Sequence, residues 1–592
     1  MAFDSFVLHA VKTDLEKHLV QTPCKVQRVI QPNAVTLLLE FRGQRPGAEA
    51  LFFSIHPGSS RVHLTSRHYP RPSTPPPFCM LLRKHLSGGR LVSVEQPPLE
   101  RMLYLHFLAT NEQGRESPKT LVAEIMGRHS NLILIDPLVN EKPKILGCLK
   151  PVPAALNRYR AILPNHPYDP PPLQDKLHPF ALNYEYFRQE VLQQQGTRIE
   201  AFFLDHFQGF SPFLAREIAS RAGMDMLAAS AAPLLWEKLQ ELMAIYTSAA
   251  WQPTLLHGLA GLPEDYFAFK PHQNFTGTLR FFSSMSRLLD EFFEYKERHE
   301  AKTGLYRYFH QLVTRQLEKT RRKEKKQQKE LAETERAEEY RRLGELLYLN
   351  IHAIPPKSRQ FEAKNPYEES GGSVLIPLDP GISPSQNAQR YFKKYRKAKQ
   401  GAKEISRQLK ITRQEIKYLD SVLFAMEKAD LESLGEIREE LEEAGYLPRQ
   451  QAEPREKKAR LQKPLSFLSS QGETILVGRN NRQNDDLSLR LAAKTDYWLH
   501  AKNIPGAHVI IRSSNPHEAT LVEAALLAAH FSRASRSSKV PIDYTRVKNL
   551  RRIPGPRPGM VTYSNFKTLY VTPDEKSMAP LLGRAVRQRP ES

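Results

Sequence analysis

Two long, highly charged segments with almost no proline or glycine constrain the fold of this chain most. They cover residues 286–349 and 386–445, and a shorter, loop-rich stretch, 350–385, separates them. The second segment carries apolar residues at spacings of 3, 4 and 3, the a/d seam of a coiled coil: Ile416, Leu419, Leu423 and Met426. We therefore predict an antiparallel coiled-coil hairpin formed by helices 286–349 and 386–445, with a small middle domain, 350–385, at its tip.

The rest of the chain divides into segments of mixed pattern on either side of the hairpin. Residues 1–183 contain short β-branched or leucine-rich runs bounded by Gly, Pro and Asn, and residues 184–285 have a helical pattern. Beyond the hairpin, 446–463 is a polar linker with two prolines, and 464–576 mixes strand and helix signals. The last residues, 577–592, form a basic tail that we expect to be disordered. The predicted fold class is multidomain α+β.

A glycine turn between two short helices lies within residues 201–223. This Gly-Phe-Ser-Pro turn resembles those of helix-hairpin-helix modules, whose turn amides can face a phosphate. Any pair of antiparallel helices needs a similar turn, so a purely structural role is the alternative.

Charge and composition narrow the classes of partner. The 592 residues carry a formal net charge of +22, which favours polyanionic partners, nucleic acid first and an anionic membrane surface second. Only three cysteines occur, far apart, which argues against a disulfide scaffold or a cysteine zinc site. No apolar run reaches the roughly 18 residues that span a bilayer, and the first residues do not resemble a signal peptide. We expect a cytoplasmic protein with no membrane partner.

The basic charge is concentrated in three blocks. Residues 315–329 and 390–403 lie in the two long segments and hold eight and seven Lys or Arg. The second block includes Lys393, Lys394 and Lys397, for which we predict contacts with a phosphate backbone; a solvated helix face is the alternative.

The third basic block, 533–557, lies in the last domain. It includes Arg551, Arg552 and Tyr544 and is followed by Tyr563, a composition typical of RNA-facing surfaces.

Motifs for catalysis are missing from the sequence. There is no phosphate-binding loop, zinc-protease motif, nucleophile elbow or dinucleotide fingerprint. Asp496, His500 and His508 lie close in sequence, but their spacing fits no helix face, so we predict no metal site. We expect no cofactor and no enzymatic activity.

Longer motifs resemble a known family. FCMLLRKHLSGG at 78–89 and EIMGRHSNLI at 124–133 look like the N-terminal (NFACT-N) domain of the NEMF/RqcH family of ribosome quality control proteins. Four C-terminal motifs resemble the family's RNA-binding (NFACT-R) domain, and a fifth motif that resembles the family lies at the start of the second long helix. These five are GRNNRQND (478–485), DYWLHAKNIPGAHVII (496–511), VPIDYT (540–545), PGMVTY (558–563) and NAQRYFKKYRK (387–397).

The resemblance implies a function on stalled ribosomes. Family members bind the large (50S) subunit that still carries peptidyl-tRNA, and recruit charged tRNA, tRNA-Ala in bacterial members, without mRNA. The nascent chain then gains a C-terminal tail that marks it for degradation, and a small S4-like RNA-binding protein acts in the same pathway. The ribosome itself forms the peptide bonds, which agrees with the absence of catalytic motifs here.

The family's tRNA-recruiting Asp-Arg pair falls on Glu100 and Arg101, within EQPPLER at 95–101. The family aspartate is thus replaced by a glutamate, which keeps the charge and lengthens the side chain by one methylene. An arginine can stack on a base or bind phosphate, and the acid can orient it. We also place Arg128 and His129 in the tRNA contact; an ordinary surface pair is the alternative for Glu100 and Arg101.

The second transfer from the family concerns the C-terminal domain. Asp496, Trp498 and His500 alternate along an extended segment and therefore share one side of it. We predict that this side, together with Lys502, faces the ribosome. Alternatively, Trp498 packs into the domain core with Asp496 and His500 supporting it.

Three other functions share part of this pattern. Formamidopyrimidine-DNA glycosylases have a similar N-terminal domain, but their catalytic proline and glutamate are replaced here by Ala2 and Phe3, and no cysteine beyond Cys148 could form their zinc finger. A fibronectin-binding surface adhesin, the older family label, would need a signal or anchor that the sequence does not show. A ribosome-associated RNA-binding protein without tailing activity stays open because of Glu100.

Overall fold

The computed structural model describes most of the chain, in two compact units. The described residues are 3–22, 24–43, 50–110, 113–137, 142–172, 174–334, 337–364, 372–449, 463–553, 555 and 557–586. One unit comprises residues 1–297 and the other residues 298–592. Most of the predicted linker, 450–462, and the end of the tail, 587–592, lie outside the described residues.

The first unit is built on a large antiparallel sheet, as the β-rich pattern of residues 1–183 predicts. Alternate residues of one strand serve different cores: Leu37 and Leu39 join the main core, whereas Leu38 joins a smaller cluster with Phe52. The strand order is β4 (Arg61–Thr65), β3 (Ala50–Ser54), β2 (Thr36–Gly43), β1 (Cys24–Asn33), β5 (Arg90–Glu95), β6 (Met102–Thr110), β7 (Glu116–Glu124), β8 (Asn131–Asp136), β9 (Lys144–Cys148).

Two helices from this N-terminal part pack on the sheet. Helix α1 (Ser5–Leu15) begins at Asp4, whose carboxylate accepts a hydrogen bond from the Val7 amide at 3.0 Å. Helix α2 (Pro77–Leu86) begins with proline at its first position, where no backbone N–H is needed. Apolar residues of both helices join the main core of the sheet.

A helical part follows, and it ends in a small sheet that the sequence did not predict. Four helices, α3 (Tyr184–Gln193), α4 (Ile199–His206), α5 (Pro212–Ala222) and α6 (Ala232–Ser248), agree with the predicted helical pattern. Within the same range, 184–285, three short strands pair in the order β11 (Pro263–Phe267), β10 (Thr254–His257), β12 (Thr278–Phe281). Buried Leu255 and Tyr266 of this sheet extend the core that the helices share with the large sheet.

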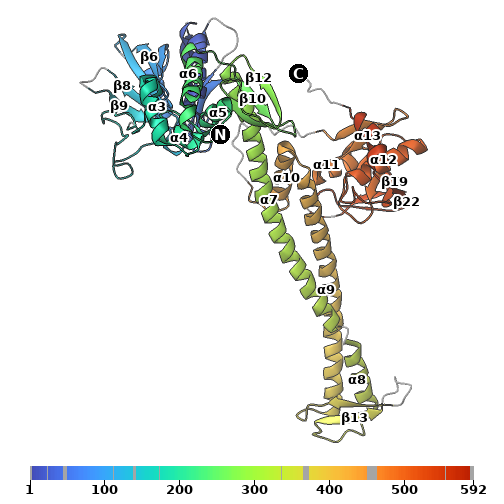
Figure 1. Ribbon diagram of the computed structural model, residues 1–592. Helices are drawn as coiled ribbons and strands as arrows, with labels where there is room; N and C mark the ends of the chain where they lie inside the picture. The colour runs from blue at the N-terminus through green and yellow to red at the C-terminus, as the bar shows by residue number, and fades with distance from the viewer. Residues whose placement is uncertain are drawn as a thin grey trace. The chain divides into compact units, whose positions relative to one another are not determined.

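The long charged segments form long helices, joined at their far end by a small tip (Figure 1). The first segment contains α7 (Met285–Thr334) and α8 (Ala337–Leu349), and the second opens with α9 (Pro384–Glu427), capped by Ser383 and Gln386. The tip hairpin, β13 (Gln360–Lys364) and β14 (Ser373–Pro377), lies in the predicted middle domain.

Helices α7 and α9 run antiparallel, as predicted. Phe309, Val313 and Leu317 of α7 share an apolar cluster with Tyr418, Leu419 and Val422 of α9. Ion pairs link the same two helices, Arg413 to Glu324 at 2.9 Å and Arg321 to Asp420 at 3.4 Å.

The range 386–445 is not one helix. Helix α9 ends at Glu427, and α10 (Leu431–Glu443) begins at Asp430, whose carboxylate accepts from the Ser433 amide at 2.8 Å. Leu434, Ile437 and Leu441 of α10 fold back onto the apolar cluster of α7 and α9. The single predicted helix is therefore corrected to two.

The C-terminal domain has a sheet with one helix-covered face. Leu499, Ala501 and Ile542 share a core with α12 (Glu518–His530), whereas Trp498 belongs to a cluster on the other face. The strand order is β15 (Leu465–Leu468), β16 (Thr474–Val477), β18 (Val509–Ile511), β17 (Tyr497–Ala501), β19 (Val540–Arg546), β22 (Lys567–Val571).

Smaller elements complete this domain. Helix α11 (Asn481–Asp486) lies in the motif 478–485, and a separate hairpin pairs β20 (Leu550–Arg552) with β21 (Val561–Tyr563). Helix α13 (Glu575–Gly583) buries Met578 and Leu581 in the core with α12, so the predicted disordered tail is wrong for its first part. Short 3-10 or π helices in the described residues of the two units are η1 (Glu16–Val20), η2 (Gly127–His129), η3 (Pro179–Ala181), η4 (Ala229–Ala231), η5 (Leu487–Leu491) and η6 (Val547–Asn549).

Candidate nucleic-acid interface

The turn that carries Glu100 and Arg101 is fixed by hydrogen bonds from distant parts of the first unit. The Gln96 side-chain amide donates to the carbonyl oxygens of Ser5, at 3.1 Å, and Glu100, at 2.8 Å. Leu99 is buried with a left-handed φ of 60°, and its backbone N–H donates to the Tyr246 hydroxyl at 3.1 Å. Strain of this kind persists only where the surroundings hold it, so the turn has one defined conformation.

The predicted helix-hairpin-helix turn packs directly against this turn. Gln208 donates a short hydrogen bond to the Glu100 carboxylate, and Gly209, with a φ of 79°, approaches Leu99 closely. Ser211 caps α5 and also donates to Asp4 at 2.8 Å. The glycine turn therefore has the structural role that was the alternative to a phosphate contact, because it supports Glu100.

Arg101 is half-buried and lines a pocket with a volume of about 190 Å³, with Gly58, Ser59 and Gly127 among its other lining residues. It also lies close enough to Asp4 to affect the pKa of the Asp4 carboxyl. Burial raises the pKa of Asp4, and the hydrogen bonds from Val7 and Ser211 and the charge of Arg101 oppose that rise. The Arg101 guanidinium therefore adds positive charge at this pocket.

The other two predicted tRNA-contacting residues lie on the neighbouring turn. Arg128 and His129 are exposed on η2, and the Arg128 Nε–H donates to His129 Nε2 at 2.9 Å. Gly127 of the same turn lines the Arg101 pocket, and the Ile125 amide donates to the Arg101 carbonyl at 2.8 Å. The structure thus brings together Glu100, Arg101 and the Arg128–His129 turn.

Further basic and aromatic residues lie beside that turn and were not predicted. Lys150 Nζ donates to the Arg128 carbonyl at 2.9 Å. Arg160 makes two hydrogen bonds with the buried carboxylate of Glu124, at 2.7 and 2.6 Å, and its neighbour Tyr159 is 83% exposed. The Arg-Tyr-Arg run at 158–160 was the sequence signal, but it lacks the length of the recognised motifs.

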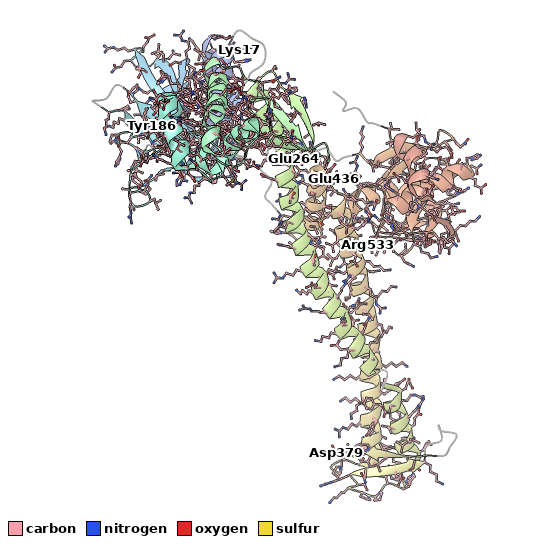
Figure 2. The ribbon with its side chains drawn as sticks, viewed as in Figure 1. Lys17, Tyr186, Glu264, Asp379, Glu436 and Arg533 are labelled. Atoms are coloured by element: carbon pink, nitrogen blue, oxygen red, sulfur yellow. The ribbon has the colours of Figure 1, made fainter. Side chains whose placement is uncertain are left out.

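In the C-terminal domain, the motif 478–485 contacts α10. Asn480 and Gln483 donate to Glu436, labelled in Figure 2, at 2.5 and 3.0 Å, and Asn481 donates to Glu440 at 3.0 Å. Arg482 pairs with Glu439 and Glu443, also on α10. These amides therefore attach the domain to α10.

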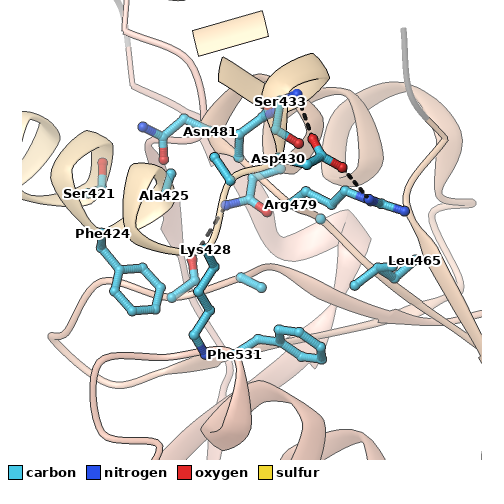
Figure 3. A pocket seen from close by; sticks show the side chains of 16 residues that line it. Ser421, Phe424, Ala425, Lys428, Asp430, Ser433, Leu465, Arg479, Asn481 and Phe531 are labelled. Carbon is cyan, nitrogen blue, oxygen red and sulfur yellow. Dashed lines mark hydrogen bonds and ion pairs between the residues drawn. The ribbon is translucent and has the colours of Figure 1, made fainter. Parts of the chain in front are cut away.

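The same attachment continues at the bend between α9 and α10 (Figure 3). Lys428 lies over the rings of Phe424 and Phe531, and its Nζ donates to the His530 carbonyl at 3.1 Å. Asp430, which caps α10, also faces Arg479 of the domain at 3.7 Å. The bend is thus fixed by the domain that follows it.

Two of the residues predicted to face the ribosome, Asp496 and Trp498, are buried within the domain. Trp498 is 1% exposed and packs with Leu487 and Ile510, and buried Asp496 accepts from the Ala493 amide at 2.8 Å. The alternative, a core tryptophan, describes their placement. His500 stacks beside Trp498 with ring centroids 5.7 Å apart, and it is only partly buried.

The remaining predicted ribosome-contacting residues of this domain are accessible. Lys502 lies over the exposed ring of Phe566 at 5.3 Å and 3.6 Å from the buried Asp543 carboxylate. Arg551 and Arg552 are exposed on β20, and Arg552 pairs with Asp485 at 3.2 Å. A basic, aromatic surface of this kind suits single-stranded RNA.

The lysines predicted to contact a phosphate backbone from the second basic block are exposed. Lys393, Lys394 and Lys397 lie on the first turns of α9, near the tip hairpin, and Lys394 lies over the rings of Tyr340 and Tyr391 at 5.4 and 5.2 Å. Their ammonium groups are thus placed where a polyanion could reach them.

Comparison with known proteins identifies the family. A model of the NFACT N-terminal and middle domains matches residues 4–460, and a model of the NFACT protein RNA binding domain matches residues 463–564. The chain belongs to the NFACT proteins. It is similar to "Rqc2 homolog RqcH" of Bacillus subtilis, with 37% identity over 98% of this chain and 100% of the relative. The resemblance to the NEMF/RqcH family is thereby confirmed.

A second curated relative agrees with this assignment. The "Rqc2 homolog RqcH" of Streptococcus pneumoniae is 36% identical over 98% of this chain and 100% of its own length. A solved C-terminal part of the fibronectin/fibrinogen-binding protein from Streptococcus suis is 38% identical and covers 47% of this chain and 98% of that structure, with a TM-score of 0.38.

Two searches of the described residues concern membranes and metals. None of the helices in the described ranges combines the length and the apolar character needed to cross a membrane. Within the same ranges, no three His, Cys, Asp or Glu side chains gather as a metal site would require.

Proposed function

We propose that this NFACT protein binds large (50S) ribosomal subunits carrying peptidyl-tRNA and recruits charged tRNA, tRNA-Ala, for mRNA-independent C-terminal tailing of the nascent chain. Membership of the family supports the general part of this proposal, a role in ribosome quality control with RNA as partner. The finer part rests on the site in the first unit.

The observation that carries the proposal is the fixed turn of Glu100 and Arg101. Gln96, Tyr246 and Gln208 hold it from three directions, and exposed Arg128 and His129 lie beside it. A contact that is ordered before binding loses less conformational entropy when RNA binds. The guanidinium and imidazole groups on one surface suit phosphate and base contacts.

The proposal assigns no catalytic step to this chain. Peptide bonds would be formed by the ribosome, and this chain would act as a non-enzymatic recruiting factor in the cytoplasm. The same proposal includes a small S4-like RNA-binding partner in the pathway.

Sequencing the RNA that co-purifies with tagged protein tests the proposal. We expect large-subunit rRNA without small-subunit rRNA, together with one enriched tRNA that names the amino acid added. Large-subunit rRNA without any enriched tRNA would favour an RNA-binding protein that performs no tailing. Absence of rRNA would contradict both.

A further inference from the structure

A cavity of about 380 Å³ lies between α9 and the C-terminal domain, on the face of the sheet that α12 does not cover. Gln414 and Lys417 of α9 line one side, and Trp498, His500 and Tyr563 line the other. Its size falls in the range of roughly 300–1,000 Å³ typical of ligand pockets.

The wall of this cavity contains a polar group without a partner. The Trp498 indole Nε1–H is buried and has no hydrogen-bond acceptor among the described residues. A buried donor left unsatisfied costs about 1–3 kcal/mol, and an acceptor on a ligand would remove that cost. The donor is therefore unsatisfied just beneath the cavity wall, where a ligand acceptor would reach it after the covering side chains shift.

Aromatic rings flank that donor. The Tyr563 ring centroid lies 4.9 Å from that of Trp498, and the Tyr563 hydroxyl is fixed by donating to Asp543 at 2.8 Å. His500 and His508 approach Trp498 from other directions, with centroids at 5.7 and 5.2 Å. Of these rings, Tyr563 and His500 are only partly buried, and they are the ones that can offer a surface to a planar ligand.

The two imidazoles do not make the cavity a site for an anion. Burial lowers the pKa of His500 to about 4 and holds the pKa of His508 well below its usual value, so both are neutral at neutral pH. The His508 ring already hydrogen-bonds to Ser488 at 2.7 Å, so the two neutral rings contribute an uncharged lining rather than an anion site.

Positive charge surrounds the cavity. Lys417 is exposed on the α9 side, and the hairpin that supplies Ile553 and Tyr563 also carries Arg551 and Arg552. Asp420, the acid in the lining, pairs with Arg321 at 3.4 Å. A ligand with a neutral planar part and a phosphate chain matches this arrangement.

We propose that this cavity receives one unstacked nucleobase of RNA, whose carbonyl or ring nitrogen accepts from the Trp498 indole N–H while its phosphates contact Lys417 and the β20–β21 hairpin. The inference deepens the proposed function, because it rests on binding of ribosomal RNA by the same domain. Buried Trp498 and partly buried His500 would then contact RNA from inside a cavity formed with α9.

A peptide carbonyl could also satisfy the indole donor, but the surroundings favour RNA. A peptide brings no polyanion for Lys417, Arg551 and Arg552, and RNA-binding proteins hold unpaired bases between rings in this way. The distinction is testable, because only RNA has bases that can be removed while the phosphates stay.

The test compares two labelled RNA probes on the full-length protein. One is a hexamer of uridines, and the other is the same ribose-phosphate chain without bases. We expect the uridine hexamer to bind at least about fivefold more tightly, the lower end of what one base stacked on an aromatic ring contributes.

A cavity-filling variant locates the base. Gln414→Trp adds bulk from α9 without changing the C-terminal domain, and Gln408→Trp is its matched control on the same helix but outside the lining. We expect the preference for bases to vanish in Gln414→Trp and to persist in Gln408→Trp. If Gln414→Trp lowers the thermal unfolding midpoint, Ile553→Trp fills the cavity from the hairpin side instead.

Two results would overturn the inference: equal binding of both probes by the unchanged protein, or a preference for bases that survives filling of the cavity. Co-sedimentation with 50S subunits is measured in parallel. If the unchanged protein does not co-sediment with 50S subunits, the proposed function is rejected. If it co-sediments but shows no preference for bases, only the proposal for the cavity is rejected.

Discussion

At the scale of single residues, Glu100, which replaces the family aspartate, has a hydrogen-bond partner in the structure. Gln208 reaches the Glu100 carboxylate from the loop between α4 and α5, 108 residues further along the chain. The longer glutamate side chain therefore ends in a hydrogen bond that restrains it. Arg101, its neighbour, lines the pocket beside Gly127.

Gly209→Ala tests whether the glycine turn positions this site. A Cβ at Gly209 would lie 2.5 Å from the Leu99 Cβ, so the Leu99–Glu100 turn must move. Overpacking of this kind costs about 1–3 kcal/mol. We expect a lower thermal unfolding midpoint and weaker tRNA binding in a filter-binding assay.

Gly196→Ala is the matched control for this change. Its φ of 80° is also left-handed, but no atom of the described structure lies within 4 Å of the added Cβ. It should show only the backbone strain, roughly 1 kcal/mol. Equal loss of tRNA binding in both variants would contradict a positioning role for Gly209.

At the scale of elements, α10 holds a buried carboxyl against the C-terminal domain. Burial raises the pKa of Glu440 to about 7, against the hydrogen bond from Asn481. A carboxyl whose pKa is higher in the folded than in the unfolded state favours folding when protonated, and this contribution is lost as the pH rises from about 4.5 to 7.

We therefore expect the packing of the C-terminal domain on α10 to strengthen by about 1 kcal/mol between pH 8 and pH 6. Glu440→Gln keeps the acceptor for Asn481 and removes the charge, so it should abolish that pH dependence. Urea unfolding at both pH values, followed by tryptophan fluorescence, measures the effect. An identical pH response in the variant would assign the titration to another group.

The start of α9 carries the second prediction at this scale. Charge reversal of Lys393, Lys394 and Lys397 to glutamate should weaken binding to 50S subunits and flatten its salt dependence, because each lost phosphate contact lowers the slope of log K against log salt by roughly 0.7–0.9. Co-sedimentation at several salt concentrations measures both quantities. Unchanged affinity and slope would leave these lysines as a solvated face.

At the scale of the whole molecule, sequence patterns predicted the elements better than their contacts. Charge and the lack of proline and glycine were enough to predict α7 and α9. The apolar spacing of Leu434, Ile437 and Leu441 continues the helical period, so nothing but the capping Asp430 marked the break before α10. Alternation placed Trp498 and His500 on one side of a strand, but it cannot tell which side is buried.

The same limit applied to the site residues: sequence motifs pointed to them, but not to their contacts. The family motif pointed to Glu100 and Arg101, but the hydrogen bond from Gln208 joins residues far apart in sequence, and no local pattern encodes it. The amides of the motif 478–485 were part of the RNA-binding resemblance, yet they bond to Glu436 and Glu440 of α10. Recognition of a motif therefore identified the domain without the role of each side chain.

The proposed tRNA contact and the three lysines at the start of α9 belong to different compact units. We therefore expect that tRNA binding and subunit binding can be lost independently. Arg101→Ala removes a positive group of the first unit while the turn keeps its backbone bonds to Gln96 and Tyr246. We expect tRNA to disappear from the co-purified RNA while 50S rRNA stays. Arg188→Ala, an exposed arginine of α3, is the control and should change neither.

Combining Arg101→Ala with the lysine reversals makes the separation quantitative. Substitutions at sites that share no partners add in free energy, so the combined variant should show the tRNA loss of one and the subunit loss of the other. Loss of 50S rRNA by Arg101→Ala alone would instead mean that Arg101 contributes to subunit binding or to folding. Thermal unfolding of the same variant distinguishes these two, because only a folding role lowers its midpoint.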